Sequence, residues 1–415
     1  MRRLIDIGRL NLDADLKKII KKDDFILFER KNKFNSTQFK NKILLTEWLN
    51  FSVDCDFEFD YNKIVKDELV YFLYERENRF TYSLSRFQNK VVSYIFNLAS
   101  NLISNNINEI IFNTTPHNLN TYLLYQVAIE SGINVVWCNL TLLRSRYSIT
   151  RISSDKREYI LPLKDSNLFS KIEIEWLKTR SSEYKLPDYE QQRKNQMLGS
   201  YYNFWIDLVK WHKRIDLVYW KFKIHKKYNR ITKDFKLPEN YILFPLHYQP
   251  ERTTLPEAEV FHNQIYALKI LIKSLPKGTV VVAKEHPSTF SNMCHWKYRW
   301  SDYYFADEKL LWAPINFDNG ILIQKSRIVA SINGSVCFEA LLLKKKVVFF
   351  AENILKLFPN VHFYSNIKNL RIFLSSYKFT DNSYQQTIEN SLHQTNKYSN
   401  SSEIYKSFYL NYLTK

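Results

Sequence analysis

Four short polar segments could bind an anion or move a proton, and each follows an apolar run that predicts a β-strand. Ligands of parallel α/β sheets bind beyond the carboxyl ends of the strands, so we expect the functional site among these segments. In chain order they are TTPHN at 114–118, HYQPERTT at 247–254, KEHP at 284–287 and SINGS at 331–335.

The SINGS segment has the residue types of a phosphate-binding turn. Gly334 permits a tight turn, and we expect Ser335 to cap a helix that starts near Val336. The first N–H groups of such a helix attract an anion. Glu339 lies one helical turn beyond Ser335 and could accept hydrogen bonds from a ribose. The alternative is an ordinary capped helix that carries a surface glutamate.

The KEHP segment places a cation, an acid and an imidazole at the end of the run TVVVA. Pro287 favours an extended conformation at His286. His286 could therefore donate to a phosphate oxygen while Lys284 supplies positive charge. A structural histidine remains the alternative for this segment.

The other two segments offer acid–base groups. In HYQPERTT, the polar side chains suit sugar or nucleotide hydroxyls, and we expect Gln249 to contact the donor and Glu251 to act in catalysis. In TTPHN, His117 is the expected general base, because the ordinary pKa of histidine lies near working pH. The acids and histidines between 247 and 262 lack H-E-x-x-H spacing, so no metal site is predicted.

Composition removes several classes of site. The six glycines are never closer than fourteen positions, which excludes G-x-G-x-x-G and the Walker loop. The four cysteines are too far apart for a C-x-x-C pair and fit a reducing cytoplasm. A net charge of +18, from 60 basic and 42 acidic residues, indicates an anionic partner. Such a partner could be nucleic acid, a phosphorylated ligand or an acidic membrane face.

The order of expected elements predicts an α/β protein with two similar halves. The clearest unit is a strand at 109–113, a helix at 119–131 and a strand at 134–138. Strands and helices alternate again from 241 onward. The expected divisions are residues 1–155, a basic helical connecting or inserted region at 156–238, a second α/β domain at 239–375 and a helical tail at 376–415.

No run of eighteen apolar residues occurs, and acidic residues interrupt the first eighteen positions. We therefore expect a soluble chain without a signal peptide. The stretch WHKRIDLVYWKFKIHKKYNR at 211–230 alternates aromatic and cationic residues, as a membrane-surface element does. A solvated basic helix is the alternative.

KEHPSTF and SINGSVCFEALLLKKKVVFF resemble the donor half of bacterial capsule and surface-polysaccharide glycosyltransferases, including Kdo-transferase and sialyltransferase-like enzymes. The resemblance spans roughly residues 105–150 and 240–365. It implies a GT-B fold, with two Rossmann-like domains facing a cleft, the first binding the acceptor and the second the donor.

The resemblance also implies residue roles. His286 and Ser335 would hold the phosphate of a nucleotide sugar, with a CMP sugar favoured, and Glu339 would bind its ribose. The reaction would need no metal or other cofactor. The acceptor would be a saccharide or a lipid-linked glycan, at the cytoplasmic face of the membrane. The Asp-Gly or Glu-Gly pair that supplies the base in sialyltransferase-like enzymes does not occur here.

Other functions remain open at this point. Teichoic-acid-type glycerophosphotransferases share a His-Pro and a Ser-plus-acid pattern. A metal-dependent GT-A enzyme would use a D-x-D motif, which Asp54–Asp56 and Asp13–Asp15 both satisfy. A nucleic-acid-binding protein would explain the charge, but no zinc finger, RRM signature or arginine-rich tract accompanies it, so we expect no nucleic acid. A non-catalytic relative of a transferase is the last alternative.

Overall fold

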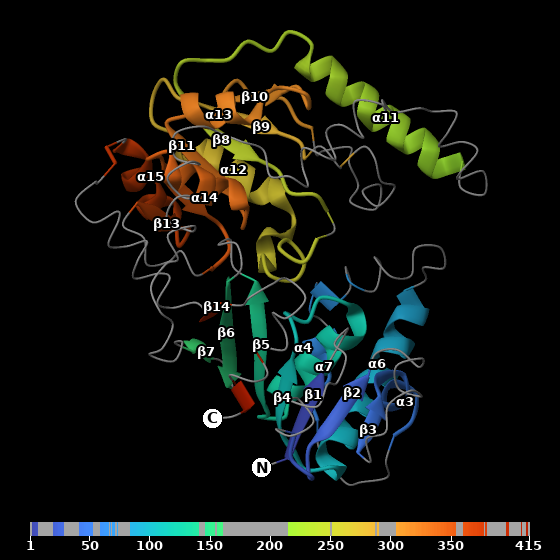
Figure 1. Ribbon diagram of the computed structural model, residues 1–415. Coiled ribbons are helices and arrows are strands. Elements are labelled where there is room, and N and C mark those ends of the chain that lie inside the picture. The colour runs from blue at the N-terminus through green and yellow to red at the C-terminus, as the bar shows by residue number, and fades with distance from the viewer. Residues whose placement is uncertain are drawn as a thin grey trace. The chain divides into compact units, whose positions relative to one another are not determined.

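The chain folds into two units, Met1–Asn167 with Glu389–Lys415, and Leu168–Ile388. Figure 1 shows them in a computed structural model, coloured along the chain. The residues that it describes are 2–6, 20–28, 41–52, 59–65, 67, 69–70, 73, 84–140, 146–153, 156–160, 215–249, 251–286, 289, 304–353, 360–376, 378–379, 396–397, 408 and 412–413. Asp13–Asp15 and Asp54–Asp56 lie outside these ranges.

The first unit is built on an eight-stranded sheet. Its parallel part has the order β3-β2-β1-β4-β5, so the direction of the strand order reverses between β1 and β4. Antiparallel strands extend it beyond β5. The strands are β1 (Arg2–Asp6), β2 (Phe25–Phe28), β3 (Lys42–Leu44), β4 (Ile107–Phe112), β5 (Asn134–Leu140), β6 (Arg146–Ser153), β7 (Lys156–Ile160) and β14 (Asn396–Lys397), and the helices are α3 (Leu45–Asn50), α4 (Asn62–Val65), α6 (Leu84–Ser104) and α7 (Leu119–Glu130).

The second unit is built on a six-stranded parallel sheet with the order β10-β9-β8-β11-β12-β13. This is the Rossmann order 3-2-1-4-5-6, with its switch point between β8 and β11. The strands are β8 (Tyr241–Pro245), β9 (Val280–Lys284), β10 (Leu310–Ala313), β11 (Ile328–Ser331), β12 (Lys346–Phe349) and β13 (Val361–Phe363), and the helices are α11 (Ile215–Thr232), η2 (Glu259–His262), α12 (Gln264–Ser274), α13 (Asn319–Lys325), α14 (Ser335–Leu342) and α15 (Ile367–Ser375).

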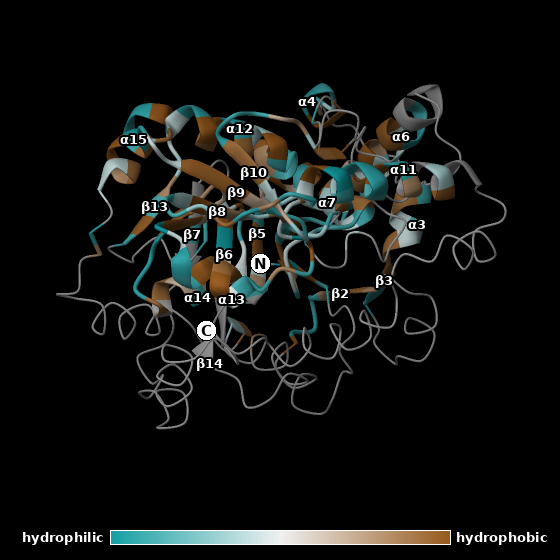
Figure 2. Ribbon diagram, turned by 90° about the horizontal axis from the view of Figure 1, so that it is seen from above, coloured by the Kyte–Doolittle hydropathy of each residue, from teal (hydrophilic) through white to brown (hydrophobic). Residues whose placement is uncertain are grey.

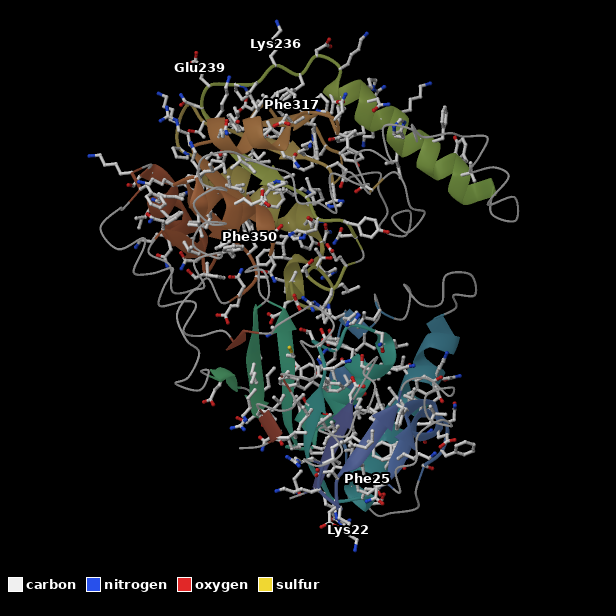
Figure 3. All side chains as sticks on the ribbon, in the orientation of Figure 1. Lys22, Phe25, Lys236, Glu239, Phe317 and Phe350 are labelled. Atoms are coloured by element: carbon white, nitrogen blue, oxygen red, sulfur yellow. The ribbon has the colours of Figure 1, made fainter. Side chains whose placement is uncertain are left out.

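The parallel strands form where the sequence has short apolar runs, because such runs can be buried on both faces of a sheet. Every residue of β11 and β12 is buried. Figure 2 shows hydrophobic colour on the strands of the second sheet and mixed colour on helices α12 and α15. Beneath the loops, Phe350, labelled in Figure 3, packs against Phe244 and Phe261 at ring-centroid distances of 6.2 and 5.1 Å. This core supports the carboxyl ends of β8 and β12.

The expected α/β class with two Rossmann-like units is confirmed, and the local differences have physical causes. β1 was not expected, because Arg2–Asp6 is a very short run flanked by charge, yet it lies at the centre of its sheet. Residues 156–160 form strand β7 rather than the expected helix. After β8, helix α12 begins at Gln264 and is preceded by the short turn of η2.

Two segments expected to lie between or after the domains are integrated into the units. Helix α11 packs on β10, where Tyr228 is buried and donates its hydroxyl to the carbonyl of Ala313. In the tail, Tyr412 donates to a carboxylate oxygen of Glu109 at 2.8 Å and accepts from Arg151 at 2.9 Å. Among the helices of the described ranges, none is both long and apolar enough to cross a bilayer.

Candidate functional site

The second sheet brings three of the predicted loops to one edge. Strands β9, β8 and β11 are neighbours and run parallel, so the segments that follow them leave the sheet side by side. His286 follows β9, His247 follows β8, and Ser331 ends β11. The candidate site therefore lies at the switch point between β8 and β11, where doubly wound sheets bind their ligands.

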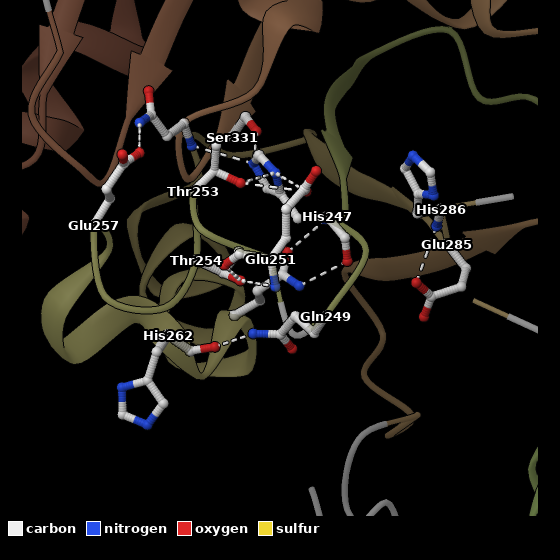
Figure 4. A network of polar contacts seen from close by, with 12 residues as sticks. His247, Gln249, Glu251, Thr253, Thr254, Glu257, His262, Glu285, His286 and Ser331 are labelled. Carbon is white, nitrogen blue, oxygen red and sulfur yellow. Dashed lines mark hydrogen bonds and ion pairs between the residues drawn. The ribbon is translucent and has the colours of Figure 1, made fainter. Parts of the chain in front are cut away.

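His247 is fixed at this edge by its backbone and by its ring (Figure 4). Its backbone N–H donates to Gln264 Oε1 at 2.7 Å, and its carbonyl accepts from Gln264 Nε2 at 3.0 Å. Its ring Nε2 lies 3.1 Å from Ser331 Oγ and accepts the backbone N–H of Asn333 at 3.2 Å. The side chain is only 9% exposed.

These contacts determine the tautomer of His247. A backbone N–H can only donate, so Nε2 must accept and the hydrogen of the neutral ring must lie on Nδ1. Nδ1 is 3.4 Å from Thr253 Oγ1, which can accept this hydrogen, and 3.8 Å from Glu251 Oε2, which is too far for a direct hydrogen bond. The ring is thus oriented from both of its nitrogens.

Glu251, expected to be catalytic, lies at the same edge with a side chain that is 47% exposed. Burial works to raise the pKa of this carboxyl group, but polar contacts with His247 and Thr253 hold the pKa below its ordinary value. Glu251 is therefore ionised at neutral pH and can accept a hydrogen bond or a proton.

A serine, a histidine and a glutamate lie in succession here, as in the catalytic triad of a hydrolase: Ser331, His247 and Glu251. Their geometry gives them a different role. Ser331 is fully buried, so its hydroxyl cannot reach a substrate. The lone pair of His247 Nε2 is also occupied by the Asn333 amide, so the ring is poorly placed to activate the serine. The cluster is a structural connection between two loops.

Glu285 was not expected as a functional residue, and it anchors the KEHP segment. Its buried carboxylate accepts hydrogen bonds from the His286 backbone N–H at 2.9 Å, Thr289 Oγ1 at 2.8 Å and the Tyr304 hydroxyl at 2.8 Å. Burial raises its pKa to about 7, although these donors act in the opposite direction. Tyr304 lies nineteen positions along the chain, so no local sequence pattern could reveal that contact.

His286 and Lys284 differ in their surroundings. The ring of His286 is half-buried and lies 6.1 Å from the ring of Tyr248, centroid to centroid, so it faces the loop after β8. Lys284 is 4% exposed, and its ammonium group donates to the side chain of Asn319 at the start of α13. The expected anion contact thus fits His286 better than Lys284.

The predicted phosphate turn follows β11, with one correction. Helix α14 starts at Ser335, and its N-cap is Gly334, which provides no side-chain cap. Ser335 is therefore exposed in the first turn and does not cap the helix. Glu339 is half-buried one turn further on. The first N–H groups of any helix lack intrahelical partners, so this end of α14 can receive an anion.

Gln249 has a structural hydrogen bond where a donor contact was expected. It is buried, and its amide donates to the carbonyl of His262. The bond holds the segment after β8 against η2. Sequence alone could not separate this role from ligand binding, because a glutamine in a polar loop serves either purpose.

In the first unit, His117 lies in the loop after β4, beside the switch point with β1. This position corresponds to that of the turn after β11 in the second unit. Its Nδ1 is 2.9 Å from the carbonyl of Thr115, so the hydrogen of the neutral ring lies on Nδ1 and Nε2 can accept a proton. Thr115 is itself held by a hydrogen bond of 2.9 Å to Asn139 on β5. The general-base role of His117 stays a prediction.

Metal ligands are not grouped in the part of the chain that the structure describes, where no set of three or more His, Cys, Asp or Glu side chains could hold an ion. The candidate site contains the imidazole of His286, the N-terminus of α14, and carboxylates at Glu251 and Glu339.

No protein-family model matches the chain, and no curated protein matches it. Among solved structures, UDP-GlcNAc 2-epimerase from Methanocaldococcus jannaschii is similar at 13% identity over 92% of this chain and 94% of that chain, with a TM-score of 0.28. The KpsC β-Kdo 2,7 transferase of Thermosulfurimonas dismutans is similar at 12% identity over 86% and 98%, with a TM-score of 0.32.

The wall teichoic acid polymerase TagF, in its H444N variant, is similar at 11% identity over 100% of this chain and 88% of that chain, with a TM-score of 0.25. TM-scores of this size carry no information on activity. The Rossmann assignment of each unit therefore rests on the strand order of the chain itself.

Proposed function

We propose that the chain is a GT-B-type glycosyltransferase that moves a sugar from a nucleotide sugar to a surface-polysaccharide or lipid-linked acceptor. One observation carries the proposal. His286 and the N-terminus of α14 both leave the carboxyl edge of the second sheet at strands that flank β8, the site where a Rossmann unit binds a nucleotide. The resemblance of KEHPSTF and SINGS to donor-binding segments agrees with this position.

In the proposed reaction, negative charge builds on the phosphate as the sugar leaves. The helix N-terminus and the His286 imidazole are donors that can stabilise this charge, while Glu339 binds the ribose. An inverting transfer needs no protein nucleophile, because the acceptor hydroxyl attacks the sugar directly. Glu251 is ionised at the same edge and is available for a hydroxyl of the donor.

The acceptor hydroxyl must lose a proton during the attack. We assign this step to His117, because its Nδ1 hydrogen is held by the Thr115 carbonyl and Nε2 is then the basic nitrogen. A CMP sugar is the favoured donor, and no metal or other cofactor is required. Activity that persists in EDTA is expected, and complete loss that Mg²⁺ restores would contradict this point.

A thermal-shift screen tests nucleotide binding. CMP, UDP, GDP and CDP-glycerol are the ligands, and cytidine is the control that lacks phosphate. A ligand at 100 times its Kd should stabilise the fold by about 2.7 kcal/mol. We expect CMP to raise the Tm and cytidine to leave it nearly unchanged. A shift with CDP-glycerol alone would indicate a glycerophosphotransferase, and no shift with any nucleotide would overturn the proposal.

We further propose that α11 contacts an anionic membrane surface near a lipid-linked acceptor. The helix buries Val218, Ile224 and Tyr228, and it exposes Tyr219 and Phe222 at 57% and 42%. Its exposed stripe continues toward the C-terminus with Lys223, Lys226 and Arg230. Aromatic rings followed by cations match the interface and headgroups of an acidic bilayer.

Vesicle sedimentation tests the membrane proposal. K223E/K226E should bind vesicles of phosphatidylserine and phosphatidylcholine more weakly than wild type at low salt, because each cation contributes about 1 kcal/mol near such a surface. K273E/K277E makes the same change of net charge at exposed lysines outside α11 and is the matched control. Equal binding by both variants would contradict the proposal.

A further inference from the structure

We propose that His247 is a positioning residue that holds the phosphate-binding turn 331–335 in its working shape through its Nδ1–H tautomer. The role in binding rests on the proposed function, whereas the tautomer and the shape of the turn do not. The sequence pattern did not assign His247 to the site, and its role follows from contacts that cross the switch point.

The ring of His247 connects two loops that only the sheet brings together. Strands β8 and β11 pair in register, so the segments after them emerge side by side. From the β8 side, Nε2 reaches both Ser331, at the end of β11, and the backbone N–H of Asn333, at 3.1 and 3.2 Å. Nε2 of His247 thus contacts the turn at two positions. These contacts restrict the backbone of the turn.

The backbone of His247, which carries the ring, is also fixed. Gln264, which is fully buried, donates to the His247 carbonyl and accepts from its N–H. Both main-chain groups of His247 are therefore bonded to one rigid side chain at the start of α12. The ring can change its contacts only by rotation of its own side chain, and Thr253 and Glu251 beside Nδ1 disfavour that rotation.

The turn is held from its other side by side chains. Asn333 Oδ1 accepts from Asn353 at 2.9 Å, and Asn333 Nδ2 donates to Glu257 at 3.4 Å. His247 supplies the contact to the backbone of Asn333, which these two residues do not make. The backbone of Asn333 leads directly into Gly334, the N-cap of α14.

The ring also packs against that N-cap. A β-carbon placed at Gly334 would lie 3.4 Å from His247 Cε1, so the glycine backbone rests close to the imidazole. Loss of the ring would remove both the hydrogen bond to Asn333 and the packing under the start of the helix. The amides of the first turn of α14 would then lose their fixed direction.

His247 does not act on the ligand directly in this account. Its side chain is 9% exposed, and Nε2 is already used within the protein. A change at His247 should therefore act on the geometry of the anion site, and a side chain that restores the acceptor at the Nε2 position should restore binding. This rescue separates a positioning role from simple loss of stability.

H247Q and H247N are the matched variants, because the glutamine amide reaches about as far as Nε2 and the asparagine amide only as far as Nδ1. We measure CMP and UDP binding by calorimetry. Removing one hydrogen bond of about 1 kcal/mol predicts affinity about fivefold weaker in H247N. H247Q should stay within about threefold of wild type by the same relation. Equal affinity in all three proteins, or equal loss in both variants, would overturn the proposal.

Two measurements do not depend on nucleotide binding. Long-range ¹H–¹⁵N NMR of the histidine rings should show a neutral Nδ1–H tautomer for His247, and amide exchange at Asn333 should accelerate in H247N but not in H247Q. If wild type binds none of the nucleotides, the proposed function fails, and these measurements alone decide whether His247 holds the turn. An Nε2–H tautomer, or unchanged exchange in H247N, would overturn it.

Discussion

A β-carbon at Gly334 would lie 2.6 Å from the hydroxyl oxygen of Ser331. This separation is shorter than a carbon and an oxygen can adopt without movement. The φ angle of Gly334 is −89°, so the glycine is needed for close packing and not for an unusual backbone. The start of α14 thus approaches the end of β11 as closely as a residue without a side chain allows.

G334A should therefore destabilise the protein by about 1 to 3 kcal/mol, the usual cost of overpacking. S331A/G334A should recover part of this loss, because the serine oxygen that causes the clash is absent. Urea denaturation of wild type, S331A, G334A and the double variant measures the interaction energy. Additive effects of the two substitutions would show that the clash is not the cause.

Glu285 should make stability depend on pH. Because its folded-state pKa is raised from 4.5 to about 7, the native protein holds a proton that the unfolded chain releases above pH 4.5. This contribution is fully present below pH 4.5 and is lost as pH rises toward 7. The free energy of unfolding should fall relative to E285Q by about 2 to 3 kcal/mol over that interval.

The comparison of E285Q with wild type at several pH values isolates this residue, and E239Q removes a carboxylate at an exposed position as a control. E285Q keeps an oxygen acceptor for His286 and Thr289, so the segment should remain folded. If the stability difference between wild type and E285Q does not change between pH 4.5 and 7, the buried carboxyl group does not titrate as described.

Tyr412 should anchor the C-terminal segment to the first sheet. Its hydroxyl donates to Glu109 and accepts from Arg151, and partial burial raises its pKa to about 12, so the proton remains in place at neutral pH. Y412F should lower the free energy of unfolding by about 1.5 to 3 kcal/mol, the usual value for hydrogen bonds to charged groups.

Y266F is the matched control for this variant, because Tyr266 is 54% exposed. The two variants lose the same atom, and a surface hydroxyl normally contributes less than about 0.5 kcal/mol. Guanidinium denaturation of both proteins checks the prediction. Equal stabilities would mean that the Tyr412 hydroxyl contributes nothing beyond its ring.

The strand ends of the candidate site could be predicted from sequence, but the connections between them could not. His286 and the start of α14 follow apolar runs whose lengths are typical of buried strands. Glu285 depends on Tyr304, nineteen positions away, and His247 on Asn333, which is 86 positions away. Such pairs leave no local period in the sequence, and they require the strand order of the sheet.

The helix start shows the same limit on a smaller scale. A serine before an apolar helix normally predicts an N-cap, but Gly334 takes that position and Ser335 begins the helix. Gly334 lies against Ser331 within the same turn and against the ring of His247, and the contact with His247 is a tertiary one. In the first unit, the loop of His117 was predicted correctly because its βαβ unit is local, whereas β1 beside it was not.

The central claim is that the carboxyl edge of the second sheet binds the phosphate of a nucleotide sugar through His286 and the first turn of α14. Calorimetric titration of CMP into wild type and H286A tests it most directly, with cytidine as the ligand without phosphate. Loss of one charge-assisted hydrogen bond of about 1.5 to 3 kcal/mol predicts CMP binding about 10- to 100-fold weaker in H286A and unchanged weak binding of cytidine. CMP binding of equal strength in both proteins, or none in wild type, would contradict the claim.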